Sequence, residues 1–165
     1  MPKFDQQTAV AAMEIQQLVS EWVAELDFNG GLTMPRLITE DCEYFVGGTL
    51  YRGHAPVLKF YTDRGERVRT QQRDGVRTQR HTVSTFRIAF PAEGRSEFSF
   101  TLVNYSAEGK APALNLVGPT IIADCRMQAH READGEWRIS LFDSTPVFIG
   151  NDPFLNASVA PKQTS

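Results

Sequence analysis

The chain has 165 residues, of which 41% are apolar and 22% charged, and a net charge of −3 at pH 7. This length suits one domain with a single core, and the composition is that of a folded protein rather than a disordered or fibrous one. The weak negative charge excludes the broad positive field that extended nucleic-acid or anionic-membrane surfaces need. We therefore expect a small-molecule ligand, no nucleic acid and no membrane partner.

The first residues and the cysteines indicate the compartment. The N-terminal segment leads into a mixed polar helix without the apolar stretch of a signal peptide, and no run approaches the roughly 18 apolar residues of a membrane helix. Cys42 and Cys125 are the two cysteines, in no CxxC or zinc-ligand arrangement, and their neighbours suggest interior positions. We expect a cytoplasmic protein with two reduced structural thiols.

The first part of the chain is predicted to hold helices and one hairpin. Apolar residues at three- and four-residue spacing predict a helix over residues 5–29, and a short helix follows over 34–38. Residues 42–52, with two central glycines, predict a β-hairpin. A further helix begins at 53 and fades near Asp63.

An arginine-rich segment follows this helix. Six arginines lie between residues 63 and 80 with almost no apolar residues between them, which predicts a solvated loop or flap. Such a segment can be a lid that meets an anionic substrate, since guanidinium groups pair well with carboxylates. More often it is a solvated excursion or an oligomer contact, and Asp63, Glu66 and Asp74 offset part of its charge.

The remaining chain is predicted to be nearly all β. Strands are expected over residues 82–90, 96–105, 119–132 and 136–142, separated by turns or loops. The last two alternate apolar and polar residues, so their hairpin has one apolar and one polar face.

This order of elements predicts an α+β fold. Amphipathic helices and a strongly twisted sheet must bury their apolar faces against each other. We expect a curved antiparallel sheet wrapped around the N-terminal helices, forming a cone with an internal pocket. Residues 1–150 would form this single domain, and residues 151–165 a C-terminal tail, disordered from about Val159. Apolar residues on the outer face of the sheet predict a homodimer or homotrimer.

Asp27 and His81 are the residues best suited to catalysis. Asp27 continues the inward row of the first helix by one step of four, near a helix C-terminus, where a carboxylate needs a donor or a cation. His81 opens a strand of the sheet that covers this helix. Strict alternation places it on the face of Val83 and Thr85, opposite Phe86, and does not decide which face is inward.

If His81 faces inward, the two side chains can form an Asp–His pair. The carboxylate would fix the imidazole tautomer and raise its basicity, which makes a general base in an apolar cavity. Each residue alone more often has a structural role, the aspartate as a cap or solvated group and the histidine as a packed polar residue.

The other histidines and the missing motifs exclude several classes. His54 at a helix start and His130 on a polar strand face form no metal-ligand spacing, so we expect no metal. The chain lacks GxSxG, P-loop and strand-linked GxGxxG motifs, which leaves hydrolase, NTPase and dinucleotide functions without support. We expect no cofactor.

Five short motifs point to a family resemblance: Leu26-Asp27, Asp41-Cys42-Glu43-Tyr44, Tyr51-Arg52-Gly53-His54, Arg80-His81-Thr82-Val83-Ser84 and Asp134-Gly135-Glu136-Trp137-Arg138-Ile139. Over about residues 8–148 the chain resembles the SnoaL-like branch of the nuclear transport factor 2-like, or cystatin-like cone, superfamily. In the scytalone dehydratases, lindane dehydrochlorinases and bile acid 7α-dehydratases of this superfamily, an Asp–His pair removes a proton from carbon while a leaving group departs, without metal or cofactor. Asp27 and His81 match the positions of that pair.

The resemblance also implies roles for other residues. Tyr44 and Tyr51 are similar to tyrosines that polarise a carbonyl or assist the leaving group in the dehydratases. Scytalone dehydratase has a second histidine in the next strand, whereas Asn104 or Tyr105 occupies that region here, which argues against a true scytalone-type reaction.

These observations predict a cofactor-independent lyase or isomerase, dehydratase-like, acting on a small, mostly apolar cyclic substrate. Asp27 would orient His81, which takes the proton, while Tyr44 or Tyr51 donates a hydrogen bond to the developing oxyanion. The side chains expected to shape the cavity are Trp22, Phe60, Phe98, Asn104 and Met127.

The alternative is a non-catalytic ligand-binding or assembly protein. The small β-subunits of aromatic-ring-hydroxylating dioxygenases are similar in fold, and there the cone serves assembly. An Asp–His pair within hydrogen-bond reach in a closed pocket favours the enzyme. A filled cone with His81 facing outward favours the assembly protein.

Overall fold

The computed structural model describes residues 4–114, 116 and 118–159 and has the expected α+β architecture. Its elements are α1 (Gln6–Asn29), the 3₁₀ turn η1 (Met34–Leu37), β1 (Ile38–Val46), β2 (Thr49–Arg52), α2 (His54–Gln71), the 3₁₀ turn η2 (Arg73–Gly75), β3 (Arg77–Ala92), β4 (Arg95–Glu108), β5 (Ile121–Arg131), β6 (Trp137–Ile149) and α3 (Pro153–Val159). The predicted first helix, hairpin and later strands are confirmed, although β3 and β6 are longer than predicted.

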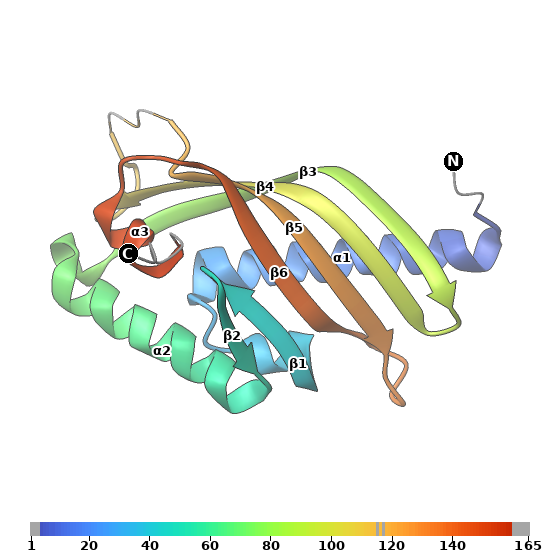
Figure 1. Ribbon diagram of the computed structural model, residues 1–165. Coiled ribbons are helices and arrows are strands. Elements are labelled where there is room, and N and C mark those ends of the chain that lie inside the picture. The colour runs from blue at the N-terminus through green and yellow to red at the C-terminus, as the bar shows by residue number, and fades with distance from the viewer. Residues whose placement is uncertain (1–3, 115, 117, 160–165) are drawn as a thin grey trace.

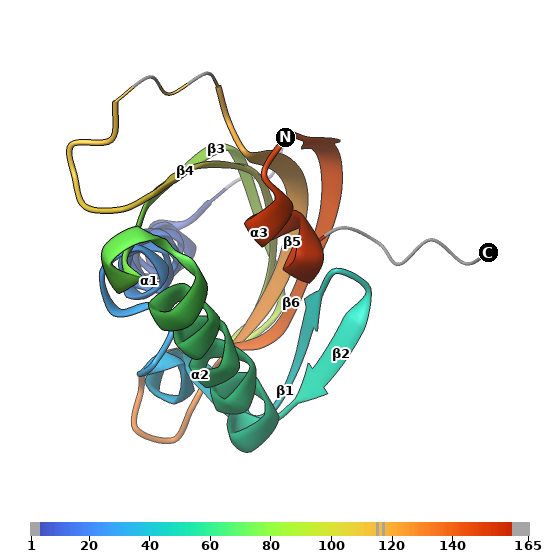
Figure 2. The ribbon, with the colours of Figure 1, turned by 90° about the vertical axis from the view of Figure 1, so that its left-hand side faces the viewer.

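One six-stranded sheet, ordered β2-β1-β6-β5-β4-β3, forms the larger layer. It curves over α1 in Figure 1, and the end-on view of Figure 2 shows α1 and α2 closing its concave side. Neighbouring strands are antiparallel except β1 and β6, which run parallel. The sequence predicted an antiparallel sheet, but strands separated by a long stretch of chain are free to pair in parallel.

Helix α1 has defined signals at both ends. The carboxylate of Asp5 accepts the backbone N–H of Thr8 at 2.8 Å, and the Thr8 hydroxyl accepts the Asp5 N–H at 2.9 Å, which is a capping box. Gly30 ends the helix with a left-handed φ of 66°. From Ala11 to Leu26 the helix buries one face against the core, and this face includes Ile15, Val19 and Trp22.

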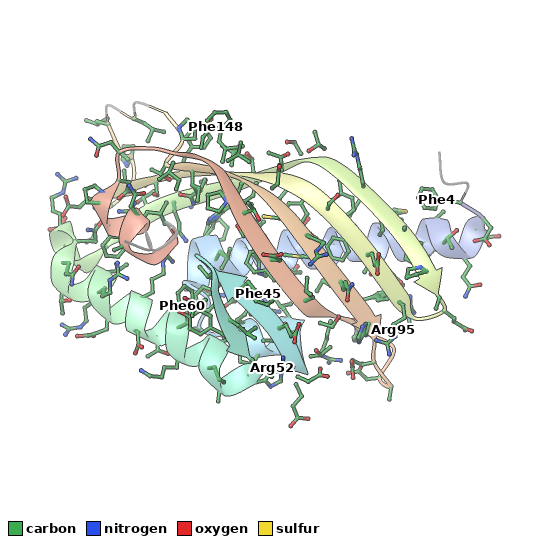
Figure 3. The ribbon with its side chains drawn as sticks, in the orientation of Figure 1. Phe4, Phe45, Arg52, Phe60, Arg95 and Phe148 are labelled. Atoms are coloured by element: carbon green, nitrogen blue, oxygen red, sulfur yellow. The ribbon has the colours of Figure 1, made fainter. Side chains whose placement is uncertain are left out.

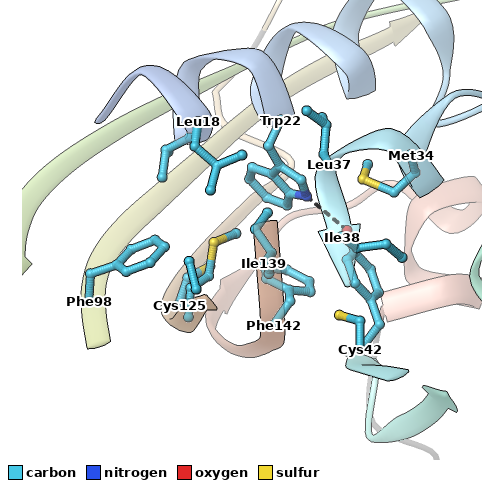
Figure 4. Packing of buried hydrophobic residues seen from close by; sticks show 14 of the residues in the cluster. Leu18, Trp22, Met34, Leu37, Ile38, Cys42, Phe98, Cys125, Ile139 and Phe142 are labelled. Carbon is cyan, nitrogen blue, oxygen red and sulfur yellow. Dashed lines mark hydrogen bonds between the residues drawn. The ribbon is translucent and has the colours of Figure 1, made fainter. Parts of the chain in front are cut away.

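The core lies between α1 and the concave face of the sheet. The apolar rows predicted for β4 and β5 are buried, which confirms their alternation. Figure 4 shows this packing around Trp22, whose indole N–H donates a hydrogen bond within the cluster. Cys42 and Cys125 are buried and free of disulfides, as expected, and burial raises the pKa of each thiol to about 12.

The arginine-rich segment is largely helical, so the predicted loop or flap was wrong. Helix α2 continues to Gln71, and β3 begins at Arg77. Lys59–Asp63 and Glu66–Arg69 ion pairs, at 2.8 and 2.6 Å, support the exposed side of this helix. The residues of α2 that face inward are Val57, Tyr61, Arg64 and Val68. Because one of them is a cation, the helical spacing of the apolar residues was not recognised in the sequence.

Strand β3 does not alternate strictly, because it contains a β-bulge. Thr85 has a φ of 52°, and the pairing with β4 shifts between Ser84 and Arg87. The extra residue brings the later apolar side chains to the same inward face as His81, where strict alternation had placed them opposite. The residues of β3 that pack against the core are Val83, Phe86, Ile88 and Phe90.

The helix α3 lies within the segment predicted to be a tail. Leu155 is buried, and the ring of Phe154 faces the guanidinium carbons of Arg67 and Arg77 at 4.7 and 4.9 Å. Asp152 forms an ion pair with Arg77. Figure 2 shows α3 across the open end of the cone. The disorder predicted for the last residues falls almost entirely outside the described part of the chain.

Candidate active site

Asp27 and His81 meet at the inner wall of the cone. Oδ1 of Asp27 lies 2.6 Å from Nδ1 of His81, and Oδ2 accepts the backbone N–H of His81 at 2.9 Å. The side chains are only 3% and 11% exposed, respectively. The last turn of α1 thus holds both the backbone and the ring of His81 in a nearly dry position.

Asn104, directly opposite His81 on β4, contacts the other side of the imidazole. Its Nδ2 lies 2.8 Å from Nε2 of His81, and the Thr120 hydroxyl donates to its Oδ1 at 2.5 Å. Since Thr120 takes the amide oxygen, the amide N–H faces the imidazole, and Nε2 must accept it. The imidazole proton therefore resides on Nδ1, where it is donated to Asp27.

Tyr44 and Tyr61 form a second polar group within the cone. Their hydroxyl oxygens lie 2.6 Å apart, and the Trp22 indole N–H donates to the Tyr44 oxygen at 3.0 Å. Burial raises the pKa of Tyr44 well above its usual value, and burial also raises the pKa of Tyr61, so both phenols stay protonated. One phenolic proton bridges the pair. The other has no acceptor among the described contacts.

Gln79 and Arg64 extend the polar lining. Gln79, two residues before His81, is buried; it donates to the carbonyl oxygen of Leu26 at 2.6 Å and accepts from Arg64 at 2.7 Å. Sequence reasoning selected neither residue. Gln79 and His81 share one face of a strand, and Arg64 follows Tyr61 at helical spacing, so both could have been found once β3 and α2 were given their full lengths.

An interior cavity of about 90 Å³ lies between these groups. A groove of about 410 Å³ runs along α1 and β3 between side chains such as Val23 and Phe86. His81 borders both spaces. A cavity that binds benzene has a volume of about 150 Å³, which is larger than this interior cavity, so we expect a cyclic ligand to extend into the groove or to open the interior cavity.

Most of the predicted site residues gather at the interior cavity. Trp22, Tyr44, Phe60, His81 and Asn104 line it, and Asp27 lies behind His81.

Tyr51, Phe98 and Met127, which the sequence also predicted at the site, do not line this cavity. Tyr51 packs on Phe60, with ring centroids 4.9 Å apart. Figure 3 labels Phe60 beside the β1–β2 hairpin. Phe98 and Met127 are paired across β4 and β5 in the core. Phe98 precedes Asn104 by six residues, or roughly 20 Å of strand. The alternation of β4 predicts which face of the sheet Phe98 lies on, but not how far along the strand it is from the cavity.

The remaining histidines have other neighbours. His54 hydrogen-bonds through Nε2 with the carbonyl oxygen of Ile38 at 3.1 Å, and His130 contacts Arg95. Among the residues that the structure describes, no group of three or more His, Cys, Asp or Glu side chains is placed to hold a metal ion. No helix in the described part is both long and apolar enough to cross a membrane.

Comparison with known proteins identifies the fold. No protein-family model and no curated protein sequence matches the chain. Among solved structures, the hexachlorocyclohexane dehydrochlorinase LinA type 2 matches with a TM-score of 0.69 and 16% identity, over 89% of this chain and 92% of that one. ActVI-ORFA from Streptomyces coelicolor matches with a TM-score of 0.69 and 15% identity, over 87% and 98% of the two chains.

A candidate scytalone dehydratase from Novosphingobium aromaticivorans matches over 96% of this chain and 97% of that one, with a TM-score of 0.65 and 16% identity. At such low identity the similarity defines the fold alone. The chain shares the fold of these structures, a SnoaL-like cone, as the sequence motifs had implied.

Proposed function

We propose that this protein is a cofactor-independent lyase or isomerase, dehydratase-like, with Asp27 and His81 as its general base. The observation that carries the proposal is the 2.6 Å contact between the two side chains in a nearly dry wall of the cavity. Structural neighbours named as a dehydrochlorinase and a candidate scytalone dehydratase support an enzyme-like role at the level of the fold. The substrate would be small, cyclic and mostly apolar.

Proton abstraction requires a free lone pair on Nε2 of His81. In the described state the Asn104 amide N–H occupies that lone pair. A substrate carbonyl oxygen that accepts this N–H would release the lone pair and bring the adjacent C–H bond close to it. General-base catalysis of this kind contributes about 10²- to 10⁴-fold in rate.

The elimination would then transfer one proton to His81 and release the leaving group. The C–H bond breaks and its proton moves to Nε2, while the electron pair forms a carbon–carbon double bond. The bond to the leaving group breaks at the neighbouring carbon. When that group is hydroxyl, the imidazolium returns the proton and water departs. Asp27 stabilises the imidazolium because its carboxylate already accepts the Nδ1 proton.

The phenol pair would stabilise negative charge on the substrate oxygen. Tyr44 was expected in this role, and Tyr61 replaces Tyr51 as its partner because its hydroxyl lies 2.6 Å from that of Tyr44. One phenolic proton bridges the two hydroxyl groups, and the second proton is available for a hydrogen bond to a developing oxyanion. The amide N–H of Asn104 is the second donor at the same cavity.

Deuterium exchange tests this function without requiring the natural leaving group. Wild-type protein in D₂O, incubated with a panel of cyclic β-hydroxy and β-chloro ketones, should exchange or eliminate at the carbon next to the carbonyl, as followed by NMR. His81→Ala should slow this by at least 10²-fold, in line with loss of a general base, while circular dichroism shows that the variant is still folded. If the wild type catalyses neither exchange nor elimination with any compound of the panel, the proposal is refuted.

A non-catalytic assembly role is the second candidate. It is favoured by the exposed apolar side chains at the end of β6, where Val147, Phe148 and Ile149 are 49%, 66% and 41% exposed. The inward position of His81 and its contact with Asp27 favour the enzyme instead.

A further inference from the structure

Arg64 brings a positive charge to the wall of the interior cavity. It lies on the inward stripe of α2, three residues after Tyr61, and lines the cavity together with His81 and Asn104. Its guanidinium donates a hydrogen bond to the neutral side-chain oxygen of Gln79 at 2.7 Å. Among the described residues no carboxylate lies within ion-pair distance of Arg64.

The surroundings of Arg64 leave its charge uncompensated. Burial lowers the pKa of Arg64, the Tyr61 hydroxyl opposes this shift, and Arg77 and Arg67 lower the pKa further. Asp152 acts in the opposite direction, but its carboxylate is already in an ion pair with Arg77. A guanidinium keeps its proton inside proteins, so the charge remains and an anion that reaches it is stabilised.

We propose that Arg64 binds a carboxylate of the ligand, which makes the substrate a cyclic carboxylic acid. A guanidinium presents two parallel N–H donors that match the two oxygens of a carboxylate. The free phenolic proton of the Tyr44–Tyr61 pair borders the same cavity and supplies a further donor. The interior cavity, at about 90 Å³, takes the compact carboxylate end, while the ring lies toward His81 and the groove of about 410 Å³.

The identification of this ligand as a substrate rests on the proposed function, whereas carboxylate binding at Arg64 does not. A purely structural role for Arg64 would be to hold Gln79, which in turn holds the last turn of α1 through Leu26. That role predicts a loss of stability without any change in ligand preference. Binding preference is therefore the measurement that separates the two roles.

Isothermal titration calorimetry with the full chain gives this preference directly. The two probes are 1-cyclohexenecarboxylate and its neutral carboxamide, which share one shape and differ in charge. Wild type should bind the carboxylate on the order of 10- to 100-fold more tightly, the value of a charge-assisted pair. Arg64→Gln should abolish the preference, and Arg64→Lys should retain part of it.

Arg69→Gln is the matched control. Arg69 is on the same helix, but it is exposed and paired with Glu66, so its loss removes the same charge without touching the cavity. This variant should keep the wild-type preference. Equal affinity for the two probes, no binding of either probe, or an undiminished preference in Arg64→Gln overturns the inference. If Arg64→Gln does not fold, the wild-type affinity ratio and Arg64→Lys decide.

His81→Ala separates this inference from the catalytic proposal. The variant should keep the carboxylate preference, because Arg64 and the tyrosines remain. A preference that depends on Arg64, with no turnover of any panel compound, supports the carboxylate site while the function fails. Exchange that depends on His81, with no carboxylate preference in the wild type, overturns the carboxylate site alone.

Discussion

Nδ2 of Asn104 lies 2.8 Å from Nε2 of His81, on the side of the imidazole opposite Asp27. The Thr120 hydroxyl holds the amide oxygen of Asn104, so the direction of every hydrogen bond through the imidazole is fixed. His81 therefore has its proton on Nδ1, which is the tautomer that the proposed general base needs. Its Nε2 lone pair accepts the Asn104 amide N–H, and in the proposed reaction a substrate oxygen would accept that N–H instead.

Asn104→Asp should remove the base while preserving the shape of the site. A carboxylate at this position would accept a hydrogen bond from a protonated Nε2, so His81 would be held as an imidazolium with no lone pair to offer. We expect the rate of deuterium exchange to fall by about 10²-fold or more. Asn104→Ala, which adds no charge, should lose less. An Asn104→Asp variant as active as the wild type near neutral pH would contradict this assignment of the imidazole proton.

Thr120 is expected to act as a positioning residue through Asn104. Thr120→Val keeps the shape of the side chain but releases the amide oxygen, so the amide can rotate and present that oxygen to His81. We expect a drop in kcat of about tenfold, the value of one hydrogen bond, with little change in KM. Thr120→Ser keeps the hydroxyl and should restore the rate. A melting temperature lowered without any change in kcat would show that Thr120 only supports the fold.

The sequence predicted that Asp27 and His81 could form a pair but left the orientation of His81 open. Asp27 could be placed inward because helical spacing is strict, and α1 has a capping box and a terminal glycine. The orientation of His81 could not be decided, because the bulge at Thr85 changes the parity of β3 and leaves apolar residues at both odd and even positions. A one-residue bulge has no clear signature in a single sequence.

The polar lining was missed for a different reason. The sequence predicted Arg64 to be solvated. Its hydrogen-bond partner, Gln79, lies on β3, and the sequence did not predict that β3 begins early enough to contain Gln79. Helical spacing from Tyr61 places Arg64 on the inward stripe of α2 only when the helix is known to continue past Asp63. Depth along a strand is equally hidden, which is why Phe98 and Met127 were placed at the cavity and lie in the core instead.

The outer face of the sheet still predicts a homo-oligomer. Val103, Ile122 and Phe148 are neighbours across β4, β5 and β6, and Figure 3 labels Phe148 near the top of the sheet. Phe148→Glu should shift the protein from dimer or trimer to monomer, because it places a charge in an apolar contact. Light scattering coupled to size exclusion measures this. Thr145→Glu, on the same strand, is the matched control, and a wild type that is monomeric at every concentration would exclude the oligomer.

Glu25 makes the stability of the fold depend on pH. This carboxylate is fully buried and accepts hydrogen bonds from the Asn29 side chain at 2.9 Å and from the N–H and hydroxyl of Thr33 at 2.6 and 2.7 Å. Burial alone would raise the pKa of Glu25. The hydrogen bonds from Asn29 and Thr33, with the charge of Arg36, outweigh burial and hold that pKa below its ordinary value of 4.5.

Glu25→Gln should therefore destabilise the protein at neutral pH and much less in acid. A carboxyl group whose pKa is lower in the folded state contributes its full stability above the unfolded value of 4.5 and loses it as the pH falls through the folded value. We expect the free energy of unfolding to fall by about 1–3 kcal/mol near neutral pH, measured by urea titration. Glu21→Gln, on the same helix with a side chain that is 45% exposed, should change it by less than about 0.5 kcal/mol. If the loss of unfolding free energy in Glu25→Gln stays the same at acid pH, the shape of the side chain, rather than its charge, explains the loss.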